Sequence, residues 1–103
     1  MIFDWKQFGT KHQNAVSTGY ICFFIKGFVI RHFTGDKWAW SVNAKYSNAK
    51  PLKHNYAASK EEAIEECEKE MIQALRDAKS EIESALEDVD RMRQARDRRR
   101  IER

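Results

Sequence analysis

The sequence predicts an α+β fold in which an antiparallel three- or four-stranded sheet is followed by one long C-terminal amphipathic helix. All twelve aromatic residues lie between Phe3 and Tyr56, whereas residues 60–103 contain no aromatic residue, glycine or proline. Aromatic and β-branched runs are typical of strands, and apolar residues at every third or fourth position are typical of a helix. We therefore expect a single domain, 1–103, made of a basic, aromatic-rich sheet region (1–58), a long helix (59–98) and a basic tail (99–103).

The charges are distributed as unevenly as the aromatic residues. Residues 1–58 hold eight Lys/Arg and two Asp, a net charge of +6. Residues 60–90 hold twelve acids and four bases, a net charge of −8, and residues 91–103 hold seven arginines and two acids, a net charge of +5. The overall charge of +3 therefore hides three segments of alternating sign, and we look for function in that pattern.

The strands are predicted from local composition. Residues 20–25 and 28–33 are aromatic and β-branched and indicate two strands, with Lys26 and Gly27 between them. Residues 34–37 (Thr-Gly-Asp-Lys) have the composition of a hairpin turn. In the next strand, 38–46, every second residue is expected to face the core, and the residues between them are expected to face water. The core set is Trp38, Trp40, Val42, Ala44 and Tyr46, and the water-facing set is Ala39, Ser41, Asn43 and Lys45.

The remaining parts of the first half are predicted with less detail. Residues 47–58 hold the only proline and indicate a basic loop, with a short fourth strand near 53–57. Residues 9–19 are polar and indicate a loop. For residues 1–8 two alternatives stay open: a short helix that begins at Asp4, or an edge strand.

The helix start is the sharpest local signal. Ser59 and Glu62 form a capping box, in which each side chain accepts a hydrogen bond from a backbone amide at the helix start. Apolar residues then recur at spacings of three and four: Ile64, Cys67, Met71, Leu75, Ala78, Ile82, Ala85, Val89 and Met92. Strands of six or seven residues cover only part of so long a helix, so we expect exposed apolar residues beyond the sheet. The alternative is a helix that folds back near residues 77–80, where Ser80 and Glu83 form a second possible capping box.

Nothing in the sequence indicates an enzyme, a metal or a cofactor. The histidines, cysteines and aspartates show none of the spacings of a metal site. A pairing of Cys22 with His32 across a hairpin is conceivable, but the alternation makes Cys22 a core thiol. We expect free thiols, no membrane-spanning segment, no secretory signal and a cytoplasmic location, in the host cell if a phage encodes the chain.

Two basic groups are candidates for contact with nucleic acid or a protein partner. Lysines follow phosphates and exposed aromatic rings stack on bases. The candidates are Arg31, Lys37, Lys45, Lys50 and Lys53 in the sheet region, and Arg96, Arg99 and Arg100 near the C-terminus. The competing explanations are that the two tryptophans of 38–40 face the core, and that the arginines stabilise the C-terminal end of the helix dipole.

Two helix surfaces are candidates for protein contact. The acidic one consists of Glu61, Glu62, Glu65, Glu66, Glu68 and Glu70, which can mimic phosphates in a groove built for nucleic acid. The competing explanation is a solvated helix face with charge pairs four residues apart. The apolar one consists of Ala78, Ile82, Ala85, Val89 and Met92, whose small alanines allow close helix approach. We expect a homodimer of antiparallel helices, in which each arginine tail lies near the other chain's acidic segment.

The layout resembles that of small bacteriophage accessory proteins. A hairpin with Trp38-x-Trp40, a basic loop and then Ser59-x-x-Glu62-Ala63 opening a long alanine-containing helix are similar to some anti-CRISPR proteins directed against type I systems. The resemblance covers residues 28 to about 95 and assigns a role to no single residue. It implies a non-enzymatic inhibitor that binds a host CRISPR-Cas surveillance complex and blocks nucleic-acid binding or nuclease recruitment. The alternative is a small nucleic-acid-binding protein that uses the basic sheet, loop and arginine tail.

Overall fold

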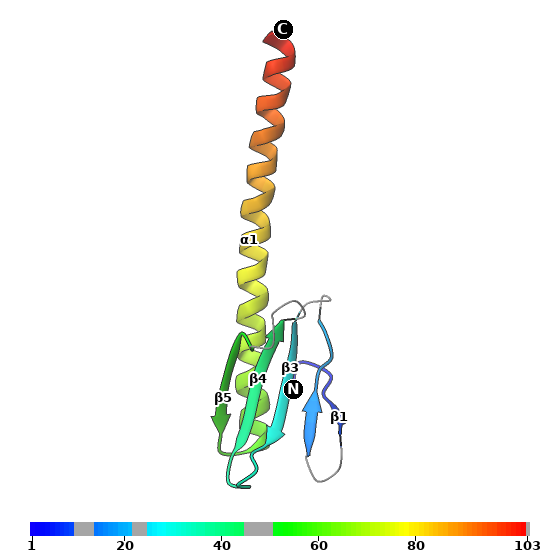
Figure 1. The fold of residues 1–103 in the computed structure, drawn as a ribbon, viewed down its shortest axis with the longest axis vertical. Helices are drawn as coiled ribbons and strands as arrows, with labels where there is room; N and C mark the ends of the chain where they lie inside the picture. The colour runs from blue at the N-terminus through cyan, green and yellow to red at the C-terminus, as the bar shows by residue number, and fades with distance from the viewer. Residues whose placement is uncertain (10–13, 22–24, 45–50, 103) are drawn as a thin grey trace. The chain divides into compact units, whose positions relative to one another are not determined.

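The computed structural model describes residues 1–9, 14–21, 25–44 and 51–102. Five strands form one antiparallel sheet in the order of the chain, followed by one long helix (Figure 1). The elements are β1 (Lys6–Phe8), β2 (Ala15–Ser17), β3 (Ile25–Arg31), β4 (Trp38–Ala44), β5 (Lys53–Ala57) and α1 (Lys60–Glu102). The predicted α+β fold with a long C-terminal helix is confirmed.

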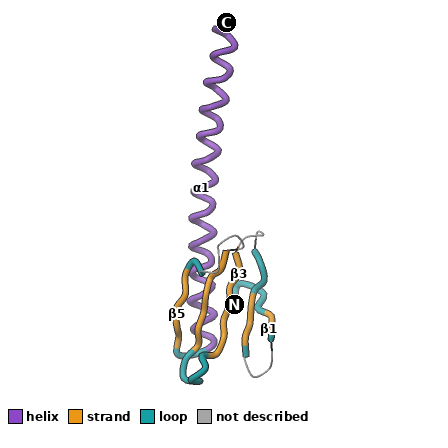
Figure 2. The backbone as a smooth tube through the Cα atoms, in the orientation of Figure 1, coloured by secondary structure: helices purple, strands orange, loops and turns teal. Residues whose placement is uncertain are grey.

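The chain divides into two compact units, and the division lies within α1. Met1–Gln73, here the sheet unit, contains all five strands and the first part of α1. Ala74–Arg103, here the helical unit, contains the rest of α1. Figure 2 shows the strands and α1 by secondary structure. The composition changes near residue 59, but the structural division lies at residue 73, because the first turns of α1 complete the core of the sheet unit.

Several sequence predictions need correction. The sheet has five strands, not three or four, because residues 15–17 form β2 within the predicted loop and residues 6–8 form β1, which settles the alternative left open for the N-terminus. Lys26 and Gly27 do not separate two strands but lie inside β3. The helix continues to Glu102, so Arg99 and Arg100 belong to its last turn and not to a separate tail. The turn at 34–37 and the fourth predicted strand, now β5, are confirmed.

The core lies between one face of the sheet and the first turns of α1. Val29, Val42 and Trp40 are buried on the sheet side, and Cys67 and Met71 are buried on the helix side. The predicted core positions of β4 are thereby confirmed for Trp40 and Val42, while Tyr46 lies outside the described residues.

Gly27 lets the helix approach the sheet closely. A Cβ built at this position would lie 2.5 Å from Met71 Sδ and 3.0 Å from Cys67 Sγ. It would also lie 2.9 Å from the ring of Trp5. A side chain at this position would therefore displace side chains of α1 and of the N-terminal segment, which explains a glycine inside a strand.

Candidate nucleic-acid interface

The sheet has a second face, opposite α1, that carries no helix in the described part of the sheet unit. Because Gly27 points at α1, the alternate residues of β3 point away from it, and the strand register extends this face across the sheet. We call it the open face. Its strand positions are Lys6, Phe8, Ala15, Ser17, Lys26, Phe28, Ile30, Ala39, Ser41, Asn43, His54 and Tyr56. None of these positions carries a carboxylate.

Aromatic rings and lysines occur together on the open face. Phe8 and Phe28 are in contact, with ring centroids 4.9 Å apart, and Phe8 is 41% exposed. Lys26 Nζ lies 5.0 Å from the centre of the Tyr20 ring, just before β3. Lysine ammonium groups at this distance from an aromatic ring are attracted by its electron-rich face.

A second aromatic group lies where the β3–β4 turn meets β5. Tyr56 is 48% exposed, and Lys37 Nζ lies 4.3 Å from the centre of its ring. The ring of His32 meets Tyr56 edge-on at 5.4 Å. Together with Ile30, Ala39, Arg31 and Phe33, these rings line an open hollow of about 660 Å³. The lining of the hollow is therefore apolar and aromatic, with one basic residue, Arg31.

Hydrogen bonds to residues of the β3–β4 turn fix the side chains of Arg31 and His32, which line the hollow. Arg31 Nη2 donates to the carbonyl oxygen of Gly35 at 3.2 Å, and Gly35 adopts a positive φ of 80° that favours glycine. The Thr34 hydroxyl donates to Asp36 and lies 2.8 Å from His32 Nδ1. The Thr34 hydrogen bond holds the pKa of the Asp36 carboxyl below its ordinary value, against an opposing contribution from desolvation. The turn is therefore ordered locally, with its one carboxylate ionised and bonded to Thr34.

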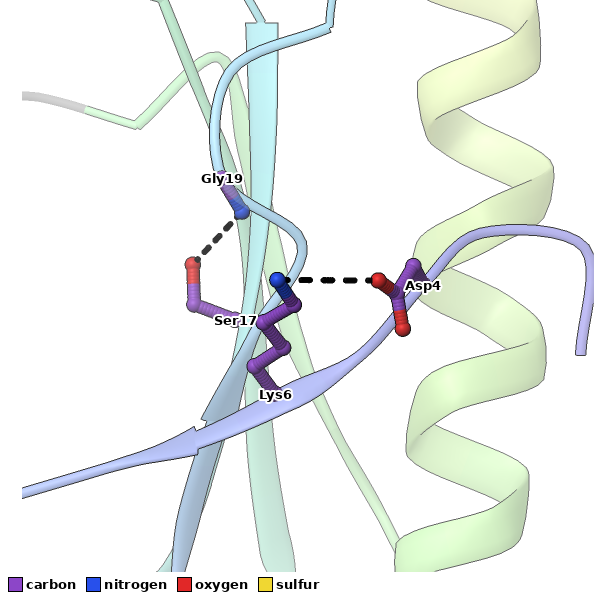
Figure 3. Close-up of polar contacts among 4 residues, drawn as sticks. All are labelled: Asp4, Lys6, Ser17 and Gly19. Atoms are coloured by element: carbon purple, nitrogen blue, oxygen red, sulfur yellow. Dashed lines mark hydrogen bonds and ion pairs between the residues drawn. The ribbon is translucent and has the colours of Figure 1, made fainter.

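At the β1 edge, the open face carries a weak ion pair. Lys6 Nζ lies 3.9 Å from Asp4 Oδ2, and both side chains are about four-fifths exposed (Figure 3). Ser17 of β2 accepts a hydrogen bond from Gly19 N at 3.3 Å in the same view. Exposed ion pairs at this distance contribute little, so the Lys6 ammonium stays available to a ligand.

The structure places the predicted basic residues in different surroundings. Arg31 lines the hollow, and Lys37 lies over the ring of Tyr56. Lys53 points to the helix side and pairs with Glu70 at 3.0 Å, so it is not part of the open face. Lys45 and Lys50 lie outside the described residues. Lys26 and Phe28 were missed as site residues because the sequence suggested an interruption at residues 26–27, inside β3. Tyr56 was missed because the pairing of β5 with β4, which sets its face, is not visible in the sequence.

The predicted acidic surface is mostly used inside the sheet unit. Glu68 is buried and accepts hydrogen bonds from Ile2 N at 2.7 Å, Phe3 N at 2.8 Å and Trp5 Nε1 at 3.0 Å. Burial raises the pKa of Glu68, but these hydrogen bonds outweigh it and leave the pKa below its ordinary value. Glu68 therefore ties the N-terminal segment to α1.

Three more of the six carboxylates have internal partners. Glu66 accepts from Trp40 Nε1 at 2.8 Å, and Glu70 pairs with Lys53. The Glu62 amide donates to Ser59 Oγ at 3.2 Å, which confirms the Ser59 half of the capping box. The Glu62 carboxylate accepts from Ala58 N at 3.2 Å, one residue before the amide of Ser59 that a capping box uses. The other two members of the predicted set, Glu61 and Glu65, are exposed. The acidic surface is therefore smaller than the sequence suggested.

The helical unit exposes its apolar residues. Ile82, Leu86, Val89 and Met92 are 59%, 59%, 44% and 68% exposed, and Ala78 is half-buried. α1 continues through residues 77–80 without a break, so the alternative in which the helix folds back at these residues is wrong. Lys79 pairs with Glu83 at 3.9 Å, Arg91 pairs with Asp88, and Arg96 Nε lies 3.7 Å from Asp97.

The described residues offer little to other classes of site. Among them, no group of three or more His, Cys, Asp and Glu side chains could hold a metal ion. Cys67 is buried, donates to the carbonyl oxygen of Ser41 at 3.3 Å, and burial raises the pKa of its thiol to about 12. Cys22, considered above as a partner of His32, lies outside the described residues. In the described part of the chain, no helix is long and apolar enough to cross a membrane.

Comparison with known proteins identifies no relative of the chain. No protein-family model, curated protein or solved structure matches the chain. We therefore infer function from the geometry of the open face and of the helical unit.

Proposed function

We propose that the protein is a non-catalytic binding protein for single-stranded nucleic acid, with the open face of the sheet as the contact surface. One observation carries the proposal. The open face presents Phe8, Phe28 and Tyr56 together with Lys6 and Lys26, and none of its strand positions carries a carboxylate. This is the alternative function that the sequence suggested, moved to a different set of residues.

The chemistry of this face favours single strands over duplexes. Unpaired bases expose both faces and can stack on aromatic side chains, which contributes about 1 to 3 kcal/mol per base. In a duplex the base faces are already stacked, so exposed rings find no partner. Lys26 and Lys37 lie beside aromatic rings and are placed to meet the phosphates between successive bases.

The competing proposal is the inhibitor that mimics phosphates with its acidic helix face. That mechanism needs several carboxylates free to meet a partner's cationic groove. Four of the six candidates already have partners within the sheet unit, and removing them from those partners would cost stability. The geometry therefore favours nucleic-acid binding over the inhibition of a CRISPR-Cas complex.

Fluorescence anisotropy tests the proposal directly. Labelled single-stranded DNA and RNA of about 20 nucleotides would be titrated with the full chain, beside the matching duplex, over a range of salt concentrations. We expect single strands to bind more tightly than the duplex. Tyr56→Ala should weaken binding roughly 5- to 150-fold, which corresponds to the loss of one stacked base. Phe28→Leu, which keeps an apolar side chain but removes the ring, should act in the same direction.

A charge-matched pair of variants locates the contact. Lys26→Glu should weaken binding. It should also make the slope of the logarithm of the binding constant against the logarithm of the salt concentration shallower by about 0.7 for each phosphate that the protein no longer neutralises. Lys69→Glu makes the same change at an exposed position of α1 and should have little effect. Equal effects of the two variants, or unchanged binding by Tyr56→Ala, would exclude the open face.

A separate variant tests the competing inhibitor. Glu61→Lys with Glu65→Lys reverses the two exposed carboxylates of the predicted acidic surface. If the full chain bound a purified CRISPR-Cas surveillance complex and this double variant did not, the result would support the inhibitor over nucleic-acid binding by the open face. We expect the double variant to bind single-stranded nucleic acid at least as tightly as the unaltered chain, because it removes negative charge.

A further inference from the structure

The apolar residues of the helical unit continue the spacing of the buried helix stripe. Positions 75, 78, 82, 85, 89 and 92 alternate in steps of three and four, the repeat of a coiled-coil seam. The residues are Leu75, Ala78, Ile82, Ala85, Val89 and Met92. In the sheet unit the same stripe is covered by the sheet, through Cys67 and Met71. In the helical unit the large members, Ile82, Val89 and Met92, are exposed.

We propose that the exposed part of this seam, residues 82–92, binds the same residues of a second copy of the chain in antiparallel orientation. The pairing is independent of nucleic-acid binding, because it uses residues of the helical unit alone. The register we propose places Ile82 opposite Met92 of the second copy and Ala85 opposite Val89, so that the four seam residues between 82 and 92 pair with one another. The small Ala85 then faces a branched side chain, which fills the centre of the seam evenly.

Leu86 supports this orientation. It lies beside the seam and is 59% exposed. In the antiparallel register the two-fold axis passes at residue 87, so Leu86 lies next to Leu86 of the second copy and two exposed apolar side chains cover each other. In a parallel pair Leu86 would lie beside Glu81 of the other chain, which would leave a carboxylate against an apolar side chain.

The arginine-rich end of the helix favours the same orientation. Residues 91–100 hold six arginines and one aspartate, a net charge of +5. A parallel pair would align this segment with its own copy, whereas the antiparallel register places it level with residues 74–83, whose net charge is −1. Residues 84–90 are acidic and meet their own copy in either orientation, and Arg91 already pairs with Asp88 there. Like charges at the arginine-rich ends are therefore separated only in the antiparallel pair.

Light scattering on the nuclease-treated full chain tests the pairing. We expect about twice the 12.2 kDa chain mass. Ile82→Asp with Val89→Asp should reduce the mass to that of one chain. Ser84→Asp with Gln94→Asp adds the same charges at exposed positions outside the seam and should leave the dimer intact. Circular dichroism of both variants would show whether the helix persists. A single-chain mass for the unaltered protein, or equal dissociation by both double variants, would overturn the proposal.

A crosslinking experiment tests the orientation. Chains with Ile82→Cys and chains with Met92→Cys would be mixed and oxidised, and the disulfides mapped by mass spectrometry, so that native cysteines are told apart. Antiparallel pairing predicts that position 82 of one chain joins position 92 of the other. Joining of 82 to 82 and 92 to 92 would contradict the antiparallel register.

Discussion

The first turns of α1 and its later turns carry the same apolar spacing but have different surroundings. In residues 60–73 the stripe contains Cys67 and Met71, both fully buried against the sheet. In residues 74–102 it contains Val89 and Met92, which are 44% and 68% exposed. The comparison shows that periodicity specifies which side of a helix is apolar, but not what covers that side. The sheet covers and stabilises the first segment, whereas the apolar residues of the second stay exposed.

Truncating a methionine in each segment should give the largest contrast. Met71→Ala should lower the free energy of unfolding by about 2 to 5 kcal/mol, because it leaves a cavity between α1 and β3. Met92→Ala, the same change at an exposed position, should alter it by less than about 0.5 kcal/mol at low protein concentration. Urea unfolding followed by tryptophan fluorescence measures this contrast, since all three tryptophans lie in the sheet unit. Equal losses for the two variants would mean that both segments share one core.

A carboxylate contrast within the first segment should give a smaller, pH-dependent effect. Glu68→Gln should cost about 1.5 to 3 kcal/mol at neutral pH, because hydrogen bonds to a charged acceptor are lost. The pKa of Glu68 is lowered in the folded protein, so its contribution is present above the unfolded pKa and is lost as the pH falls through the folded pKa. Urea unfolding at decreasing pH should therefore show the free energy of unfolding of the unaltered chain approaching that of Glu68→Gln. Glu65→Gln, at an exposed position, is the control, and a gap that persists in acid would refute the role of ionised Glu68.

The two possible capping boxes should give the smallest contrast. Ser59 Oγ accepts from Glu62 N at the true helix start, so Ser59→Ala should cost about 0.5 to 2 kcal/mol. Ser80 lies inside α1, where backbone amides are already bonded, and Ser80→Ala should change stability by less than about 0.5 kcal/mol. Thermal unfolding followed by circular dichroism measures both. A larger loss at Ser80 would indicate a helix that begins again at that point.

Features with local signals were predictable from the sequence. The capping serine at 59, the turn around Gly35 and the alternation through Trp40 and Val42 all depend on neighbours in sequence, and the structure confirms them. β2 was not predictable, since it has three residues and is held by pairing with β1 and β3. Gly27 suggested an interruption of the strand, because the sequence alone does not show that Met71, far along the chain, lies against this position.

The candidate site was predictable in kind but not in position. The basic, aromatic-rich first half indicated a possible nucleic-acid surface, and Arg31 does line the hollow while Lys37 lies over the ring of Tyr56. Lys53 was misplaced because one residue of register decides which face a side chain occupies. The acidic surface could not be evaluated from spacing alone, because Glu66 and Glu68 find their partners only when the sheet and N-terminal segment fold against α1.

Amide chemical-shift mapping by NMR, with a single-stranded oligonucleotide added to the full chain, tests the central claim most directly. We predict the largest changes on the open face, at Lys26, Phe28, His54 and Tyr56, with little change on the buried stripe of α1. Changes confined to the arginines of residues 91–100, or no changes on the sheet, would contradict the assignment of the open face as the nucleic-acid surface.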